Sequence, residues 1–212
     1  MNIPSRVQLI DVGPRDGLQN EKQPVPAAVK IELVHRLQAA GLNEIEVTSF
    51  VSPKWVPQMA DNAEVMVGIQ RQAGVLYSVL TPNMVGYQAA VASRPNEIVV
   101  FGAASQAFSQ KNINCSIEES MERFAPVVQA ALAAGMAVRG AMSCSVGCPY
   151  EGDVPAANAA CTTGAKRSML SAIEQLMFLW LKASLAAPKT TISSGLDFKA
   201  ASKPCTLGVS TE

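Results

Sequence analysis

The stretch AAVKIELVHRLQAAGLNEIEVTSF, residues 27–50, joins a helical pattern directly to a strand pattern and decides the fold class. Apolar residues recur at helical spacing in its first half, which predicts a helix over 27–40. The buried stripe of this helix is expected to hold Val29, Leu33, Val34 and Leu37. Gly41 is the residue type that most often ends a helix. The apolar run that follows predicts a buried strand over 44–50.

The same order of strand and helix recurs along the first three quarters of the chain. Further buried strands are predicted over 7–13, 76–81, 97–102 and 137–144. Two more helices are expected to begin at Asp61 and Ser116, each followed three residues later by a glutamate at capping-box spacing, and the second to end near Gly135. This order predicts parallel strands with right-handed crossovers, in a doubly wound sheet or in part of a (β/α)8 barrel. A complete barrel usually needs about 250 residues, so 212 residues are few for one.

Composition and charge narrow the class of protein. The 17 basic and 17 acidic side chains leave no net charge to attract nucleic acid or an anionic membrane. The most apolar late stretch, residues 176–181, is too short to span a bilayer. Five scattered cysteines, an odd number, do not suggest a disulfide framework. We therefore expect a soluble α/β protein of the cytoplasm, without a nucleic-acid or membrane partner.

The character of the sequence changes after about residue 157. Residues 166–187 form one helix-compatible block, and the chain from Pro188 onward is rich in Ser, Thr, Gly, Lys and Pro without a regular rhythm. We therefore predict an α/β part over 1–157 and a divergent segment over 158–212, made of one helix and an irregular tail.

The residues directly after the first predicted strand, 11–21, are the first candidate for chemistry. The carboxyl ends of parallel strands are where barrel and open-sheet enzymes keep their sites. Arg15 offers a fixed cation for a developing oxyanion, and Asp16 offers an oxygen ligand for a divalent metal. The alternative is a surface turn with an ordinary ion pair, because Gly, Pro and Asp are common turn residues.

Three further places are weighed in the same way. Glu46 interrupts an apolar run, where a buried carboxylate needs a partner such as Arg15, although plain alternation slightly favours a side chain facing water. The polar stretches over 50–58 and 109–115 are interpreted either as ligand-contacting loops or as ordinary connections. His35 is expected to be merely solvated, and Cys144 with Cys148 to be structural thiols rather than a zinc site.

These loops together resemble those of hydroxymethylglutaryl-CoA lyases, over about residues 6–157. The matching motifs are VGPRDGLQNE (12–21), TSFVSPKWVPQ (48–58), LTPN (80–83), FGAAS (101–105), KNINCSIEES (111–120), and SC (143–144) with GCPYEG (147–152). The Arg-Asp pair alone is shared with related aldol-type enzymes such as isopropylmalate and homocitrate synthases, whereas GLQNE and SPKWVPQ distinguish the lyases.

The resemblance implies a (β/α)8 TIM-barrel fold, here incomplete with about five βα units, followed by an atypical C-terminal segment. It implies a divalent cation, Mg2+ or Mn2+, and cleavage of 3-hydroxy-3-methylglutaryl-CoA, a CoA thioester, to acetyl-CoA and acetoacetate in leucine degradation. It leaves a homodimer open.

The resemblance also implies roles for individual residues. Asp16 is expected to bind the metal near the tertiary hydroxyl of the substrate, and Arg15 to face the thioester oxygen. Glu46 is expected to hold that geometry as a further catalytic residue. The substrate pocket is expected to include Gln19, Ser49 and Asn112.

Three departures from the family pattern accompany these matches. The family's metal-binding His-x-His element and its late catalytic cysteine loop have no counterpart in this sequence, in which His35 is the single histidine. Cys148 belongs to the fifth-strand motif, so it is not assigned the catalytic role, and Ala141 stands where many members carry tyrosine. A truncated or frame-shifted, catalytically silent fragment of the family is therefore the alternative to an active lyase.

Overall fold

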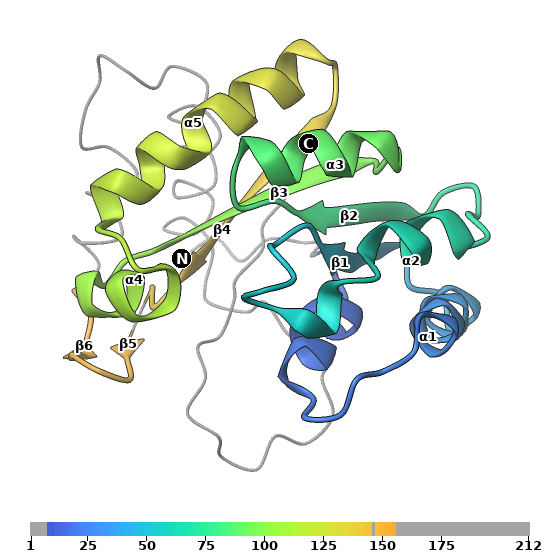
Figure 1. The fold of residues 1–212 in the computed structure, drawn as a ribbon, viewed down its shortest axis with the longest axis horizontal. Coiled ribbons are helices and arrows are strands. Elements are labelled where there is room, and N and C mark those ends of the chain that lie inside the picture. The colour runs from blue at the N-terminus through green and yellow to red at the C-terminus, as the bar shows by residue number, and fades with distance from the viewer. Residues whose placement is uncertain (1–7, 146, 156–212) are drawn as a thin grey trace, which may run out of the picture.

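Four parallel strands form the sheet of this computed structural model, which describes residues 8–145 and 147–155. The strands are β1 (Glu44–Ser49), β2 (Leu76–Leu80), β3 (Glu97–Ala103) and β4 (Ala137–Ser143), and they lie side by side in sequence order (Figure 1). Each lies within one residue of its predicted bounds at either end, so these four predictions are confirmed.

The prediction of a strand over 7–13 is wrong, although the chain does pass beside β1 at this point. Asp11 forms a single parallel bridge with Ile45 of β1. Its backbone N–H donates to the backbone carbonyl oxygen of Glu44 at 3.0 Å, and its own carbonyl oxygen accepts from the backbone N–H of Glu46 at 2.8 Å. Pairing stops there because the chain coils at once into a short π-helical turn, η1 (Gly13–Gly17), which carries a proline that cannot donate to a ladder. Val7 lies outside the described residues.

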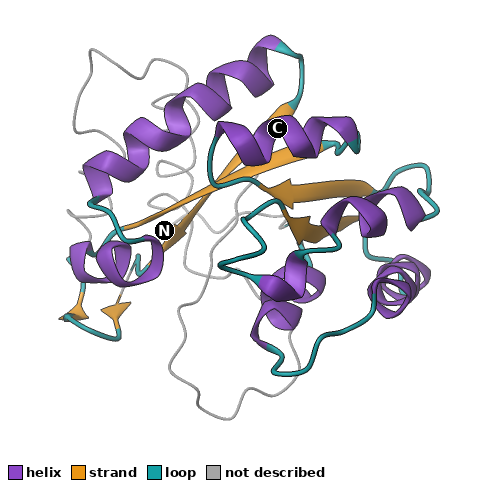
Figure 2. Ribbon diagram, in the orientation of Figure 1, coloured by secondary structure: helices purple, strands orange, loops and turns teal. Residues whose placement is uncertain are grey.

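The helices pack on one face of this sheet. They are α1 (Ala27–Ala39), α2 (Asn62–Gly68), α3 (Met84–Ala92), α4 (Gln106–Ile113) and α5 (Ile117–Ala133), and Figure 2 shows them ranged along the strands. One apolar core joins Val34, Val65, Tyr87 and Val127, from four of the helices, to alternate strand residues such as Ile45. A doubly wound sheet has helices on both faces and reverses its strand order. Sequential order with helices on one side is instead the arrangement of an incomplete (β/α)8 barrel.

The other face of the sheet, which would face the inside of a barrel, carries polar as well as apolar side chains in rows. Register pairing places Glu46, Ser78 and Glu97 side by side, and we call these three residues the lower row. The next row toward the carboxyl ends, the upper row, consists of Ser49, Leu80, Val99 and Arg139. All seven side chains belong to buried residues.

The prediction of which residues α1 buries is wrong in part. Val34 is fully buried as expected, but Val29 is 54% exposed. The buried side instead includes Lys30 and Gln38, whose polar ends find partners inside the fold. The amide nitrogen of Gln38 donates to the hydroxyl of Tyr77 at 2.6 Å.

The two predicted capping boxes have different outcomes. Ser116 caps α5 as expected, because its Oγ accepts from the N–H of Glu119 at 3.0 Å and the Glu119 carboxylate accepts in return at 2.7 Å. The helix ends at Ala133, two residues before Gly135, as predicted. Asp61 precedes α2 but makes no cap, because both its oxygens accept from Lys30 Nζ, at 2.7 and 2.9 Å.

The segment interpreted as a polar loop over 109–115 is mostly helix, so that prediction is wrong. Ser105 begins α4 by accepting from the N–H of Phe108 at 3.1 Å, and Asn114 ends it in a left-handed conformation. The short hairpin β5 (Gly147–Cys148) and β6 (Gly152–Asp153) lies beside α4, where the ring of Tyr150 stacks on that of Phe108.

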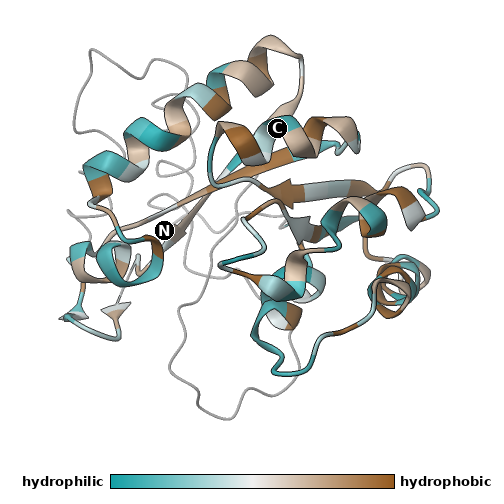
Figure 3. Cartoon of the chain, in the orientation of Figure 1, coloured by the Kyte–Doolittle hydropathy of each residue, from teal (hydrophilic) through white to brown (hydrophobic). Residues whose placement is uncertain are grey.

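Hydropathy agrees with this layering. Figure 3 shows hydrophilic and apolar residues alternating along α5, as expected for a helix with one buried side. Within the described ranges, no helix is long and apolar enough to cross a membrane. The predictions for residues 158–212, including a helix over 166–187, lie outside the described residues.

Candidate active site

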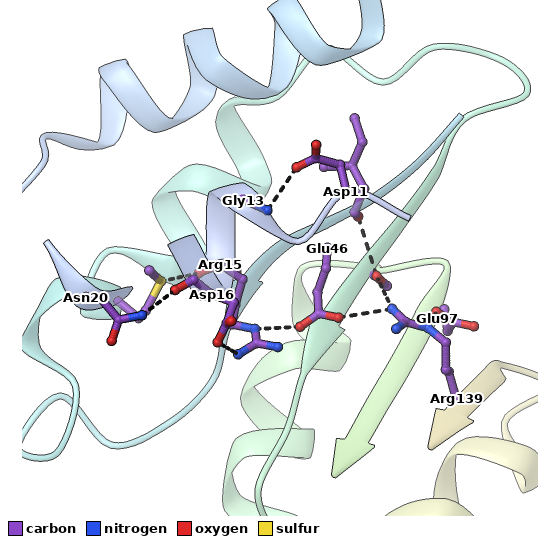
Figure 4. A network of polar contacts seen from close by, with 12 residues as sticks. Asp11, Gly13, Arg15, Asp16, Asn20, Glu46, Glu97 and Arg139 are labelled. Atoms are coloured by element: carbon purple, nitrogen blue, oxygen red, sulfur yellow. Dashed lines mark hydrogen bonds and ion pairs between the residues drawn. The ribbon is translucent and has the colours of Figure 1, made fainter. Parts of the chain in front are cut away.

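The turn that follows Asp11 carries Arg15 and Asp16 to the interior face of the sheet. The N–H of Gly13 donates to Asp11 Oδ1 at 2.8 Å, which fixes the start of the turn. A Cβ at Gly13 would lie 2.9 Å from that same oxygen, so a larger residue here would displace the Asp11 carboxylate from this contact. Because η1 starts directly beside β1, Arg15 reaches the strand that holds Glu46 (Figure 4).

Arg15 forms two ion pairs that set the plane of its guanidinium. Its Nε donates to Glu46 Oε1 at 2.5 Å, and its Nη1 donates to Asp16 Oδ1 at 2.7 Å. The Arg15 and Glu46 side chains are buried, whereas that of Asp16 is 42% exposed. The predicted Arg15–Glu46 partnership is confirmed, and the alternative of a solvent-facing Glu46 is wrong.

The third nitrogen of Arg15 stays available to a ligand. No side chain or backbone oxygen of the described segments accepts a hydrogen bond from Nη2, which Figure 4 shows without a partner. A guanidinium with two nitrogens engaged and the third open to a ligand is suited to an oxygen atom that gains negative charge.

Glu46 is ionised in spite of its burial. Loss of water works against its charge, but the positive charges of Arg15 and Arg139 and their hydrogen bonds outweigh that effect and hold the pKa of this carboxyl below its usual value. A single buried carboxylate thus connects two buried cations. Breaking such a pair typically costs about 3–5 kcal/mol, because it leaves an uncompensated charge.

Arg139 is the member of this network that the sequence did not reveal. Its Nε donates to Glu97 Oε2 at 2.8 Å, and its Nη2 donates to Glu46 Oε2 and to Ser78 Oγ, both at 3.1 Å. Glu46 and Arg139 are 93 residues apart in the chain. The one signal available was a lone arginine inside an apolar strand pattern, which needs a buried partner just as Glu46 does.

Ser49 also lies on the interior face, because of an irregularity in β1. The pairing with β2 shifts by one residue between Glu46 and Thr48, so that two positions of β1 face one of β2. This bulge turns Ser49 to the same side as Glu46, although an odd spacing would otherwise place them on opposite faces. The Ser49 side chain is fully buried, and its Oγ has no hydrogen-bond partner within residues 8–145 and 147–155.

The remaining predicted pocket residues are not joined to this network. Gln19 is half-buried in the 3-10 turn η2 (Leu18–Asn20), which follows η1. Asn112 is exposed on α4, and no hydrogen bond of the described residues connects it with Arg15 or Glu46. Their substrate contacts stay predictions.

Asp16 is a single candidate metal ligand. Among residues 8–145 and 147–155, no group of three or more His, Cys, Asp or Glu side chains could hold a metal ion. One carboxylate already paired with a guanidinium does not make a tight divalent site. The described residues therefore do not fit the cation by themselves.

Two further predictions concern residues outside the network. His35 was expected to be merely solvated, which is wrong, because it is half-buried and its Nε2 accepts from the N–H of Gln70 at 2.9 Å. Cys144 and Cys148 are buried free thiols, and Ser105 Oγ donates to the sulfur of Cys148 at 2.9 Å.

Comparison with known proteins identifies related sequences. The HMGL-like family model matches residues 6–175. The mitochondrial hydroxymethylglutaryl-CoA lyase of Gallus gallus is 62% identical over 158 residues, which are 74% of this chain and 53% of that protein. The cytoplasmic 3-hydroxy-3-methylglutaryl-CoA lyase of Mus musculus is 60% identical over 152 residues, 72% of this chain and 44% of that protein.

Solved structures give the same result. The hydroxymethylglutaryl-CoA lyase of Pseudomonas aeruginosa is similar with a TM-score of 0.73 and 56% identity, over 80% of this chain and 57% of that one. A lyase from Acinetobacter baumannii, in complex with coenzyme A and 3-methylmalate, gives a TM-score of 0.72 at 31% identity, over 85% of this chain and 55% of that one. The chain spans about half the length of the relatives it matches. It belongs to the HMGL-like family, together with these hydroxymethylglutaryl-CoA lyases.

Proposed function

We propose that this chain is a carbon–carbon lyase that cleaves 3-hydroxy-3-methylglutaryl-CoA to acetyl-CoA and acetoacetate, as in leucine degradation. The observation that carries this proposal is the buried Arg15, which Glu46 and Asp16 hold and whose Nη2 has no acceptor among the described residues. The names of the relatives and the coenzyme A bound to one of them support a CoA thioester as the substrate.

The reaction is a retro-aldol cleavage, and Arg15 acts where negative charge builds up. The tertiary hydroxyl loses its proton, the adjacent carbon–carbon bond breaks, and the new ketone becomes acetoacetate. The bonding electrons move into the thioester and form an enolate, which takes up a proton to give acetyl-CoA. Nη2 of Arg15 would donate to the enolate oxygen, a contact that gains strength because the site is buried.

Other residues have supporting roles in this proposal. Glu46 holds the guanidinium in place, and Ser49, Gln19 and Asn112 line the pocket. The buried Oγ of Ser49, which no described residue engages in a hydrogen bond, supports its part in hydrogen bonding to substrate. Asp16 would be the ligand that this chain offers to Mg2+ or Mn2+, but no step is assigned to the cation, because the described residues do not complete its site.

A catalytically silent chain is the second candidate, and the metal ligands are the reason. The described residues preserve the Arg15–Glu46 pair but provide a single candidate ligand. A chain of this kind would bind the thioester without cleaving it at a useful rate.

One pair of measurements on the purified chain tests both candidates. Binding of the CoA substrate is measured by calorimetry, and acetoacetate release is measured with Mg2+ or Mn2+ present. Loss of turnover in Arg15→Gln, with binding and turnover both retained in the exposed control Arg36→Gln, would support the lyase. Binding without turnover would support the silent chain, and no binding at all would refute both.

Two broader expectations belong to the same proposal. We propose a cytoplasmic location, which one cytoplasmic relative supports, although other relatives are named mitochondrial. We also propose a homodimer, which light scattering on the purified protein tests directly.

A further inference from the structure

Both oxygens of Glu46 are occupied, each by a different arginine. Oε1 accepts from Arg15 at 2.5 Å and Oε2 accepts from Arg139 at 3.1 Å. The carboxylate is 1% exposed, so water does not replace either donor. Its orientation is therefore set by two cations together, and a change at one oxygen is transmitted to the other.

Arg139 in turn is fixed by the lower row of the sheet. It lies in the upper row on β4, and its guanidinium turns back toward the strand starts to contact all three residues of the lower row. These three residues come from β1, β2 and β3. The Arg139 guanidinium therefore contacts each of the other three strands of the sheet. Figure 4 shows the chain of contacts running from Glu97 through Arg139 and Glu46 to Arg15.

We propose that Arg139 is a positioning residue for Arg15, acting through Glu46. The effect on catalysis rests on the proposed lyase function, whereas the effect on Arg15 itself does not. Removing the Arg139 donor leaves Glu46 Oε2 buried without a hydrogen bond, which a carboxylate avoids by rotating or by admitting water. Either response moves the acceptor that sets the plane of the Arg15 guanidinium, and so moves Nη2.

A lysine at this position would not reproduce the arrangement. Arginine presents several donors in a rigid plane, and Arg139 uses Nε and Nη2 on different carboxylates. An ammonium group is a compact point charge without that fork. Charge alone would be restored by Arg139→Lys, and orientation would not, so this variant separates the two effects.

The first test observes Arg15 directly and needs no substrate. The Nε–H groups of buried, ion-paired arginines are followed by 15N–1H NMR on the whole chain, and the Arg15 signal is assigned by its loss in Arg15→Lys. In Arg139→Gln we expect the Arg15 signal to shift and its hydrogen exchange to accelerate, because Glu46 no longer holds the Nε–H in one fixed, buried hydrogen bond. Arg36→Gln removes an exposed Arg–Glu pair whose Nε–O distance is 2.8 Å, and it should leave the Arg15 signal unchanged.

Two milder variants protect the test against misfolding. Arg139→Lys keeps the charge, and Ser78→Ala removes just one acceptor of Arg139. Both should change the Arg15 signal in the same direction, by less than Arg139→Gln does. A folded variant of Arg139 with an unaltered Arg15 signal would overturn the proposal.

The second test concerns turnover. If the chain cleaves the thioester, Arg139→Lys should lower kcat by about 10- to 100-fold with a smaller change in KM, because the Nη2 contact acts mainly on the enolate. An equal loss in Arg139→Lys and Arg36→Gln would indicate a general effect on stability and contradict the proposal. If wild type shows no turnover, the lyase function fails, and the Arg15 signal alone still decides whether Arg139 positions Arg15.

Discussion

Replacing Glu44 by glutamine should change how the stability of this protein depends on pH. Glu44 begins β1 and is 1% exposed. One of its oxygens accepts from Gln8, and the other has no hydrogen-bond partner in the described part of the chain, where Arg139 Nε lies 3.9 Å away. Burial, and then the negative charge of Glu97, raise the pKa of Glu44 from 4.5 to about 7.

The size of the effect follows from that difference of about 2.5 between the two pKa values. Each pH unit corresponds to about 1.36 kcal/mol, so the carboxyl contributes about 3 kcal/mol. Between pH 4.5 and about 7 the folded protein keeps a proton that the unfolded chain has lost. The contribution is therefore complete below pH 4.5 and is lost as the pH rises through about 7.

Urea unfolding of wild type and Glu44→Gln on both sides of this window provides the test. Glutamine resembles the protonated acid, so the variant should become more stable than wild type by up to about 3 kcal/mol between about pH 4.5 and 8. Burial also raises the pKa of Glu97, so the stability of both proteins keeps a further dependence on pH. The quantity to compare is therefore the difference in stability between the two proteins at each pH. Glu32→Gln is the control, because its hydrogen bond to Arg36 lowers the pKa of Glu32 out of the window. Parallel profiles for wild type and Glu44→Gln would refute the reasoning.

Three further predictions concern local features of the fold. Ser116→Ala removes the cap of α5 and should cost about 1 kcal/mol in urea unfolding, so an unchanged midpoint would contradict the cap. Gly86→Ala would place a Cβ 2.5 Å from a backbone oxygen and should lower the thermal midpoint by the equivalent of about 1–3 kcal/mol, whereas Gly17→Ala, with open space around it, should not. Asp61→Asn breaks the pair with buried Lys30 and should cost about 3 kcal/mol in urea unfolding, with high salt leaving most of that loss in place.

Features written into neighbouring residues could be predicted from the sequence. The four strands are apolar runs bounded by polar segments, and a buried parallel strand needs little else to be recognised. The Ser116 capping box joins groups three residues apart, so its spacing alone indicated it. Glu46 was recognised as a carboxylate that needs a partner such as Arg15 if it is buried, but alternation along the strand slightly favoured a side chain facing water, so the sequence left this pair open.

Features that depend on distant partners could not be predicted in this way. Asp61 has the position of a helix cap, but an ammonium group 31 residues earlier takes both its oxygens. The apolar pattern of α1 misplaced Val29 because Lys30 and Gln38 satisfy their polar ends inside the protein. Local polarity therefore predicts burial poorly wherever a long-range partner exists.

The charges on the interior face explain why such partners matter for function here. Glu46 lies in the middle of β1, not at the strand end where catalytic groups usually lie, and by itself it would be a costly buried anion. Two arginines make it stable, one from the turn before β1 and one from β4, the last strand of the described sheet. The guanidinium proposed to face the thioester is therefore held in place by pairing that exists only after all four strands have come together. A substitution of Arg139 on β4, far from Arg15 in the sequence, should for that reason alter the donor geometry at Arg15.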